Sequence, residues 1–256
     1  PCGSGNQPDG REDEAATALE STGAGKNRCM EIVLVRHGQP EWVREGLNVV
    51  DPPLTELGHE QAGKMAAALA AETFDEVLVS PLVRARQTAA PLYTALRVAE
   101  RVDPWLEEIR DPGWHGTPAE KAEQAYRELD ERPVDDRWRG LEAEGGETIR
   151  EFTARIRRGG EEFLASRGIV RGEHDLPVWS IAQPGARIGL VAHAGTNSAF
   201  LCLLLGLEPT PWEWDRFVFG HASMSRIEAL PVHDGFVFSL TSLSNLEHVA
   251  PEHRTR

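Results

Sequence analysis

Cysteine and positive charge are both scarce in this sequence. The 256 residues include only 3 Cys, at Cys2, Cys29 and Cys202, and their scattered positions match neither a disulfide framework nor a metal site. This usage favours a reducing compartment, and we expect a cytoplasmic protein. The formal net charge is −14, which argues against a general binder of nucleic acids. A small phosphorylated metabolite is still compatible, because a local cluster of arginines can form a positive pocket.

Long apolar runs are also missing. No stretch approaches the length needed to span a bilayer, so we expect no membrane partner. Residues 1–28 have neither apolar periodicity nor the apolar core of a signal peptide, and we interpret them as a disordered leader. We expect one catalytic domain over residues 29–247 and a frayed tail over residues 248–256. The sequence contains no internal repeat, Walker-type glycine loop or cluster of metal ligands, so we expect neither a metal nor another cofactor.

A short apolar stretch near the beginning of the expected domain is the first positive signal. Residues 32–35 read Ile-Val-Leu-Val, which predicts a strand buried on both faces. Arg36, His37 and Gly38 follow directly. In open α/β sheets the chemistry lies beyond the carboxyl ends of the strands, which is where Arg36 and His37 fall.

A second stretch repeats this arrangement. Residues 187–192 predict an apolar strand, His193 follows it, and small residues lead through Asn197 into an apolar helix over residues 198–205. A single histidine at a strand end usually does no more than satisfy a hydrogen bond. A shared catalytic site becomes the favoured interpretation when the two histidines are taken together with the two arginines and the glutamate considered below.

The rest of the pattern predicts helices around a sheet. We expect a single α/β domain whose central sheet is mostly parallel and is flanked by helices on both faces. The segment 168–186, which contains glycine, proline and mixed charge, is the expected place for an insertion that contacts a partner or shapes the substrate site. Further helices are expected at residues 62–71, 118–131 and 147–167, and further strands at residues 76–80, 224–230 and 236–242.

The motifs resemble those of a known family. Leu-Val-Arg-His-Gly at residues 34–38 is similar to the signature of the histidine phosphatase superfamily, the phosphoglycerate mutase-like proteins. Residues 80–89 match the family pattern Ser-Pro-Leu-x-Arg-Ala-x-Gln-Thr-Ala. The resemblance implies a nucleophile at His37, phosphate-binding arginines at Arg36 and Arg84, and a second catalytic and phosphate-binding histidine at His193.

The proton donor rests on a weaker match. Residues 106–116 resemble a family segment that carries the donor on a glutamate, and alignment selects Glu108 over Glu107. Asp111 and Pro112 stand where an aromatic residue is usual, so we expect a locally altered loop.

Candidate substrate contacts also follow from the resemblance. After Trp42 the family often has an asparagine that helps to hold phosphate, and this chain lacks it. Arg44 is a candidate to replace it. Gln39, Asn197 and His221 lie in segments that are close to the pocket in relatives, so we include them as candidate substrate contacts.

These features imply a metal-independent phosphatase that hydrolyses a small-molecule phosphomonoester through a phosphohistidine on His37. A mutase that returns the phosphoryl group to its product is an alternative, and so is a catalytically inactive, binding-only member of the fold. A phosphoprotein substrate also stays open, because the sequence does not show the width of the pocket. A homodimer is compatible with the sequence.

Overall fold

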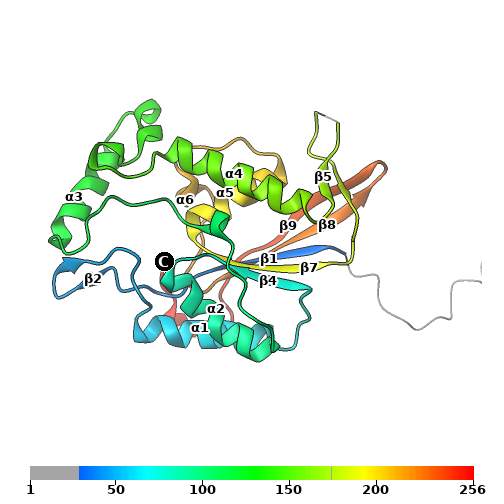
Figure 1. Cartoon of the computed structure of the whole chain (residues 1–256), viewed down its shortest axis with the longest axis horizontal. Helices are drawn as coiled ribbons and strands as arrows, with labels where there is room; N and C mark the ends of the chain where they lie inside the picture. Colours follow the sequence, from blue (N-terminus) through cyan, green and yellow to red (C-terminus); the bar gives the residue numbers. More distant parts are fainter. Residues whose placement is uncertain (1–28, 174) are drawn as a thin grey trace, which may run out of the picture.

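The computed structural model describes residues 29–173 and 175–256, so the leader expected at residues 1–28 lies outside the described part. At its centre is a seven-stranded sheet with the order β4-β7-β1-β8-β9-β6-β5 (Figure 1). The strands are β1 (Glu31–Arg36), β4 (Glu76–Val79), β5 (Ile169–Arg171), β6 (Trp179–Ile181), β7 (Arg187–Ala192), β8 (Met224–Val232) and β9 (Gly235–Asn245).

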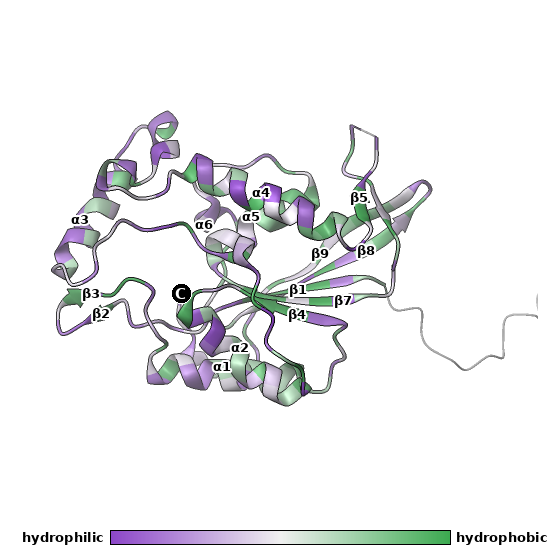
Figure 2. Cartoon of the chain, viewed as in Figure 1, coloured by the Kyte–Doolittle hydropathy of each residue, from purple (hydrophilic) through white to green (hydrophobic). Residues whose placement is uncertain are grey.

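Strand β1 is buried on both faces, as its sequence predicts. Ile32 and Leu34 belong to one hydrophobic core, whereas Val33 and Val35 belong to another. This division arises because successive side chains of a strand point to opposite faces. Figure 2 shows the hydrophobic colour of β1, β4 and β7 at the centre of the molecule.

Helices cover both faces of the sheet. Helices α1 (Glu56–Leu69) and α2 (Val83–Leu96) pack on one face, and α4 (Ile149–Ala165) and α5 (Ala194–Leu205) pack on the other (Figure 1). Each expected helix is present, with its ends shifted by a few residues. No helix in the described part of the chain is long and apolar enough to cross a membrane.

Two helix ends are set by side-chain caps. The hydroxyl of Thr55 accepts the N–H of Gly58 at 3.0 Å and begins α1. Thr148 and Glu151 form a capping box that begins α4, and such reciprocal bonds satisfy two donors that the first turn leaves free.

The expectation of a mostly parallel sheet is wrong. Among the described strands, β1 pairs with β7 and β4 pairs with β7 in parallel. The pairs β1–β8, β8–β9, β6–β9 and β5–β6 are antiparallel. The reason is that β8 and β9 are joined by the short turn that includes His233 and Asp234, and a tight turn can connect only antiparallel strands. The parallel part is the half that carries the two histidines.

A smaller layer extends beyond the carboxyl ends of the parallel strands. It contains the hairpin of β2 (Val43–Arg44) and β3 (Leu47–Asn48), helix α3 (Ala119–Asp130) and the short turns η2 (Val134–Arg139) and η3 (Glu142–Glu144) (Figure 1). Because none of its residues is fully buried, helix α3 adds nothing to the hydrophobic cores.

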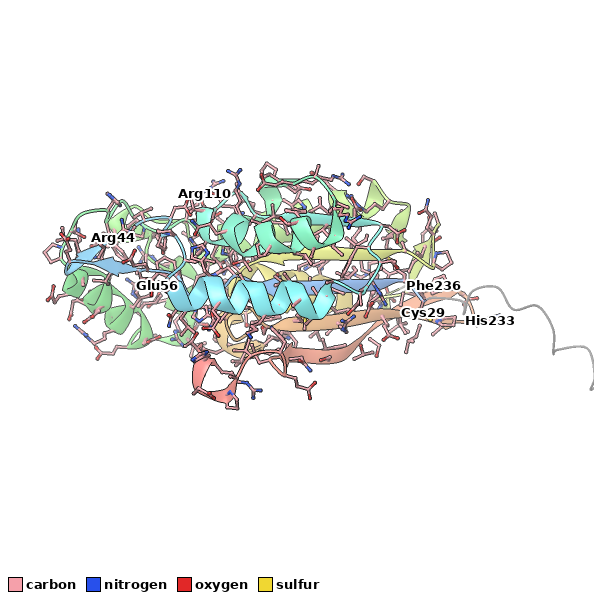
Figure 3. All side chains as sticks on the ribbon, turned by 90° about the horizontal axis from the view of Figure 1, so that it is seen from below. Cys29, Arg44, Glu56, Arg110, His233 and Phe236 are labelled. Carbon is pink, nitrogen blue, oxygen red and sulfur yellow. The ribbon has the colours of Figure 1, made fainter. Side chains whose placement is uncertain are left out.

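The segment 168–186 contributes two strands to the sheet, and none of its described residues lines the cavity described below. It forms the antiparallel pair β5–β6, and Trp179 of β6 pairs with Phe236 of β9. Figure 3 labels Phe236 near one end of the molecule, well away from Arg110. Residues of α3 do line that cavity, so the layer around α3 takes the place that we expected for this segment.

Residues 248–256 also differ from the frayed tail that the sequence suggested. They include the turn η4 (Pro251–His253), and hydrogen bonds connect them to the rest of the domain. The backbone N–H of His221 donates to the carbonyl oxygen of Thr255 at 3.0 Å. The side-chain amide of Gln61 donates to the carbonyl oxygen of His253 at 2.8 Å.

Candidate active site

The two histidines that follow the apolar strands lie side by side. Arg36 of β1 pairs with Ala192 of β7, and the backbone N–H of His37 continues the ladder with a 3.0 Å bond to the carbonyl oxygen of Ala192. The ring centroids of His37 and His193 are 5.1 Å apart. Parallel neighbours end at the same edge of a sheet, so the pairing of β1 with β7 brings the histidines together.

The hydrogen bond of His37 fixes which of its nitrogens can react. Nδ1 lies 2.8 Å from the carbonyl oxygen of Gly38, and the side chain is 3% exposed. A carbonyl oxygen only accepts hydrogen bonds, so Nδ1 carries the proton and Nε2 keeps its lone pair. Burial, aided by the charge of Arg84, lowers the pKa of His37 well below its usual value. The imidazole is therefore neutral, and its unprotonated Nε2 is available to react.

Gly38 is needed for close packing at this point. A Cβ on Gly38 would lie 2.5 Å from the carbonyl oxygen of Gly58, at the beginning of α1. The N–H of Gly38 donates to the hydroxyl of Thr88 at 2.9 Å. Helices α1 and α2 thus hold the loop that follows His37.

His193 is fully buried beside His37. Its Nε2 lies 2.7 Å from the hydroxyl oxygen of Ser80, which follows β4, and its Nδ1 has no hydrogen-bond partner among the described residues. Burial, followed by the charges of Arg84 and Arg36, lowers its pKa well below the usual value. His193 is therefore neutral and can act as a hydrogen-bond donor.

Arg36 provides the first buried positive charge. One of its terminal nitrogens donates to the carbonyl oxygen of Phe219, while its Nε is buried and has no partner in the described part of the chain. Burial lowers the pKa of Arg36 to about 10, so the guanidinium still carries its charge at neutral pH.

Arg84 provides the second positive charge, from the first turn of α2. Its side chain is 4% exposed, its Nε is also buried without a described partner, and its guanidinium lies over the ring of Trp42 at 4.8 Å. Asp51 is a weak partner, with 3.6 Å between the nearest charged atoms. A guanidinium at a helix N-terminus, with donors left free, is well suited to bind an anion.

Glu108 is held by two backbone N–H groups. One carboxylate oxygen accepts from Gly195 at 2.9 Å and the other from Ile109 at 2.9 Å. A Cβ on Gly195 would lie 2.5 Å from Trp214 and 2.7 Å from Glu108 Oε1, so only glycine allows this approach. Burial raises the pKa of Glu108 even though both hydrogen bonds oppose the shift. The carboxyl therefore keeps its proton to a higher pH than an exposed glutamate does.

His221 is a third imidazole at this site. Its ring centroid is 5.6 Å from that of His37, and its Nδ1 lies 2.8 Å from the hydroxyl of Thr255. That hydroxyl also accepts a 3.0 Å bond from the amide nitrogen of Gln61. The Gln61 orientation is fixed because its oxygen accepts the N–H of Gln39 at 2.8 Å. Burial lowers the pKa of His221 to about 3, so this ring is neutral too.

A cavity of about 350 Å³ opens over these groups. Arg36, His37, Arg84 and Glu108 line it, whereas His193 and His221 lie buried beside His37 and do not line it. Its outer wall comes mainly from segments that we did not assign to the site from the sequence. Among its residues are Trp42, Asp111, Tyr126, Leu129, Asp130, Arg137, Leu141, Trp212 and Trp214.

Two of these missed residues, Trp42 and Asp111, stand in segments that resemble the family. Asp111 stands where the family usually has an aromatic residue, which marked the loop but not its role. Tyr126 lies on the exposed helix α3, and nothing in its own segment predicts that it reaches a cavity.

All four candidate substrate contacts, His221 included, lie outside the cavity lining. Arg44 is exposed on β2 and forms an ion pair with Glu41, so it does not replace the missing asparagine. The side-chain oxygen of Gln39 accepts from the hydroxyl of Thr55 at 2.9 Å and supports the beginning of α1. Asn197 is buried in the first turn of α5.

The site has no group of metal ligands in residues 29–173 and 175–256. No cluster of three or more His, Cys, Asp or Glu side chains in this part of the chain could hold a metal ion. The positive charges next to the histidines come from arginines, and this arrangement can bind a phosphate group directly.

Known proteins share both the sequence pattern and the fold. Residues 32–240 match the family described as histidine phosphatase superfamily (branch 1). Phosphoserine phosphatase 1 of Hydrogenobacter thermophilus is 29% identical over 181 residues, which cover 70% of this chain and 78% of that protein. Glucosyl-3-phosphoglycerate phosphatase of Mycobacterium tuberculosis is 31% identical over 196 residues, which cover 72% of this chain and 79% of that protein.

A solved structure extends the similarity to three dimensions. The native structure of mycobacterial glucosyl-3-phosphoglycerate phosphatase matches with a TM-score of 0.61 and 28% identity, and the match covers 84% of this chain and 98% of that one.

Proposed function

The chain belongs to the histidine phosphatase superfamily (branch 1), and from this premise we propose that it is a metal-independent phosphatase that hydrolyses a small-molecule phosphomonoester through a phosphohistidine on His37. The observation that carries the proposal is the buried pair of His37 and His193, 5.1 Å apart. Arg36 and Arg84 lie close enough to lower the pKa of both rings. The phosphatases among the relatives support hydrolysis over binding alone.

The first step is attack of His37 Nε2 on the phosphorus atom. The hydrogen bond from Nδ1 to the carbonyl oxygen of Gly38 orients the ring and leaves Nε2 unprotonated. The N–P bond forms as the bond between phosphorus and the alcohol oxygen breaks. A covalent intermediate of this kind divides one difficult displacement into two easier ones.

The arginines stabilise the charge of the transferring group. Arg36 and Arg84 each have a buried Nε without a partner in the described chain, and guanidinium groups bind phosphate oxygens in pairs. His193 adds a neutral donor. Donors that are already in place when charge develops in the transition state account for much of the rate enhancement in phosphoryl transfer.

Glu108 gives its proton to the alcohol oxygen as that oxygen leaves. Its raised pKa keeps part of the carboxyl protonated in weak acid, and a bound phosphate dianion would raise this pKa further. In the second step the Glu108 carboxylate takes a proton from water. The water oxygen attacks phosphorus, the N–P bond breaks, and inorganic phosphate and free His37 are restored.

The size of the cavity suits a small substrate. A volume of about 350 Å³ lies at the lower end of the range of small-molecule sites. We therefore propose a phosphorylated metabolite as substrate.

The test is hydrolysis of p-nitrophenyl phosphate by the wild type and by His37→Ala. Turnover should vanish in the variant while its thermal unfolding stays close to that of the wild type. Because the N–P bond of a phosphohistidine is stable in alkali and labile in acid, rapid alkaline quench of the wild type with ³²P-labelled substrate should trap label on the protein, and none should be trapped on His37→Ala. Activity that survives in His37→Ala would reject the nucleophile.

The mutase alternative differs in the fate of the phosphoenzyme. A mutase retains the phosphoryl group until an acceptor arrives, so labelled protein would persist in buffer and discharge on addition of 2- or 3-phosphoglycerate. Rapid release of inorganic phosphate in buffer alone supports the phosphatase.

A further inference from the structure

One carboxylate in the cavity has no role in the proposed chemistry. Asp111 lines the cavity three residues after Glu108. Its Oδ1 accepts a 2.9 Å hydrogen bond from the hydroxyl of Tyr126 on α3. The ring of Tyr126 packs edge-on against Trp114, with 6.0 Å between centroids. The position of Asp111 is therefore fixed between its own loop and the covering helix.

The other charged groups on the outer wall have partners of opposite charge. Asp111 has none within 4.0 Å in the described part of the chain, and its hydrogen bond comes from a neutral hydroxyl. The paired groups of this wall are Asp130 with Arg137 at 2.7 Å, Glu147 with Arg155 at 2.8 Å, Arg110 with Glu107 at 2.8 Å and Asp215 with Arg256 at 3.5 Å.

Binding of the phosphate group changes the surroundings of Asp111. Without substrate, the nearby positive charge of Arg84 favours the ionised form of Asp111 and partly offsets its burial. A phosphate dianion on Arg36 and Arg84 neutralises their two positive charges, and Asp51 already balances part of Arg84. No nearby positive charge then offsets the negative charge of the Asp111 carboxylate, and an unpaired charge in a partly buried cavity is unfavourable.

The position of Asp111 also indicates which part of the substrate it meets. Glu108 and Asp111 both line the cavity, and the charge of Asp111 contributes to the raised pKa of Glu108. If Glu108 protonates the alcohol oxygen, the substituents of that alcohol extend along the same loop toward Asp111. Its second oxygen has no hydrogen bond in the described structure and is free to accept one.

We propose that Asp111, held by Tyr126, selects phosphomonoesters whose alcohol carries an ammonium group close to the ester and disfavours those whose alcohol carries only a carboxylate. The ammonium donates to the free oxygen of Asp111 and restores the charge balance that phosphate binding removes. This selection rests on the proposed phosphatase function and adds the chemical class of its substrate.

Three two-carbon phosphomonoesters separate charge from size. O-Phosphoethanolamine, ethyl phosphate and 2-phosphoglycolate carry an ammonium, a methyl and a carboxylate group, respectively, at the same distance from the ester. For the wild type, kcat/KM should fall in that order, by roughly tenfold or more at each step, as expected for a charge interaction in a partly desolvated site. Equal values for the three substrates, or the reverse order, would overturn the proposal without any variant.

Variants assign the effect to the residue. Asp111→Asn keeps the shape and should bring the three kcat/KM values within about threefold of one another. Tyr126→Phe removes the hydroxyl that orients Asp111 and should give an intermediate spread. Asp130→Asn is the matched control, because this carboxylate lines the same cavity but is paired with Arg137, and it should keep the wild-type order. An unchanged order in Asp111→Asn would show that another group makes the selection.

Turnover of p-nitrophenyl phosphate separates this proposal from the function on which it rests. That substrate has no ammonium, so its turnover reports the phosphatase chemistry alone: the wild type should hydrolyse it, and His37→Ala should not. A wild type that does not hydrolyse it refutes the phosphatase. A wild type that hydrolyses it through His37 but does not distinguish the three esters refutes only the role of Asp111.

Discussion

Replacement of Glu108 by glutamine tests the proton donor directly. The amide has nearly the same shape, and it loses the proton that the mechanism transfers. In the wild type both carboxylate oxygens accept backbone N–H groups, from Gly195 and Ile109, each at 2.9 Å. Glutamine has only one side-chain oxygen, so the variant loses one of these two acceptors. One of those N–H groups is left without a partner, so we expect a loss of about 1–3 kcal/mol in the free energy of unfolding.

The effect on turnover depends on the leaving group. An alkyl alcohol needs the proton, so Glu108→Gln should lower kcat/KM for an alkyl phosphate by about 10²–10⁴-fold, or roughly 3–5 kcal/mol in the barrier. p-Nitrophenolate leaves as a stable anion, so Glu108→Gln should lower kcat/KM for p-nitrophenyl phosphate by less than about tenfold. The decrease in kcat/KM for the alkyl ester, divided by the decrease for p-nitrophenyl phosphate, measures the contribution of proton transfer.

The pH dependence has a definite sign. Burial raises the pKa of Glu108, so the active protonated form is lost as pH rises through that raised value. The wild-type rate on the alkyl ester should therefore fall in that range, and the Glu108→Gln rate should not. Steady-state kinetics on both substrates from acidic to neutral pH measures this.

Glu107→Gln is the matched control for this test. Glu107 is the neighbouring glutamate, but it pairs with Arg110 at 2.8 Å and does not line the cavity. It should behave like the wild type on both substrates. Equal losses on the alkyl and nitrophenyl esters in Glu108→Gln would refute the acid role, and a loss in Glu107→Gln alone would transfer that role to the neighbour.

The remaining expectations concern phosphate binding, packing, acid stability and metals. Arg84→Lys should weaken inorganic phosphate binding about tenfold by calorimetry, because an ammonium cannot match two oxygens at once; unchanged affinity would remove Arg84 from the site. Gly195→Ala should cost about 1–3 kcal/mol of unfolding free energy, because its Cβ would lie 2.7 Å from the proton donor; a neutral effect in urea denaturation would contradict that packing. Burial lowers the pKa of His37, His193 and His221, so below about pH 6.5 the unfolded chain binds more protons than the folded one. Each of these histidines should then remove stability as pH falls, by up to about 1.4 kcal/mol per pH unit, and variants that lack one should show a shallower decline. EDTA should leave turnover unchanged, and a loss that added metal restores would reveal a metal requirement.

Local sequence was sufficient to predict the strand that leads to His37. The alternation of Ile32 and Leu34 with Val33 and Val35 reflects two cores, because a buried strand places successive side chains on opposite faces. The beginning of α1 at Thr55 also depends on groups within a short reach, because the Thr55 hydroxyl accepts the N–H of Gly58. Such features are encoded by a few neighbouring residues, and a sequence pattern can show them.

The relative directions of neighbouring strands in the sheet could not be predicted in the same way. Both strands of the hairpin β8–β9 were predicted, but the position of β8 beside β1 was not. Which strands become neighbours depends on the packing of the whole domain, and both parallel and antiparallel neighbours accept the same apolar pattern. The preference for a parallel sheet came from the half of the domain that contains the histidines.

By itself the sequence determined the groups that can react: His37 and His193 after apolar strands, Arg36 and Arg84 beside them, and Glu108 in a loop with a recognisable pattern. Only the tertiary structure decided what surrounds them. It brought Asp111 and Tyr126 into one cavity wall, and it placed Arg44 on the surface. The reason is that strand ends and helix caps follow from local chemistry, whereas the charge and shape of a cavity depend on distant segments that meet only when the chain has folded.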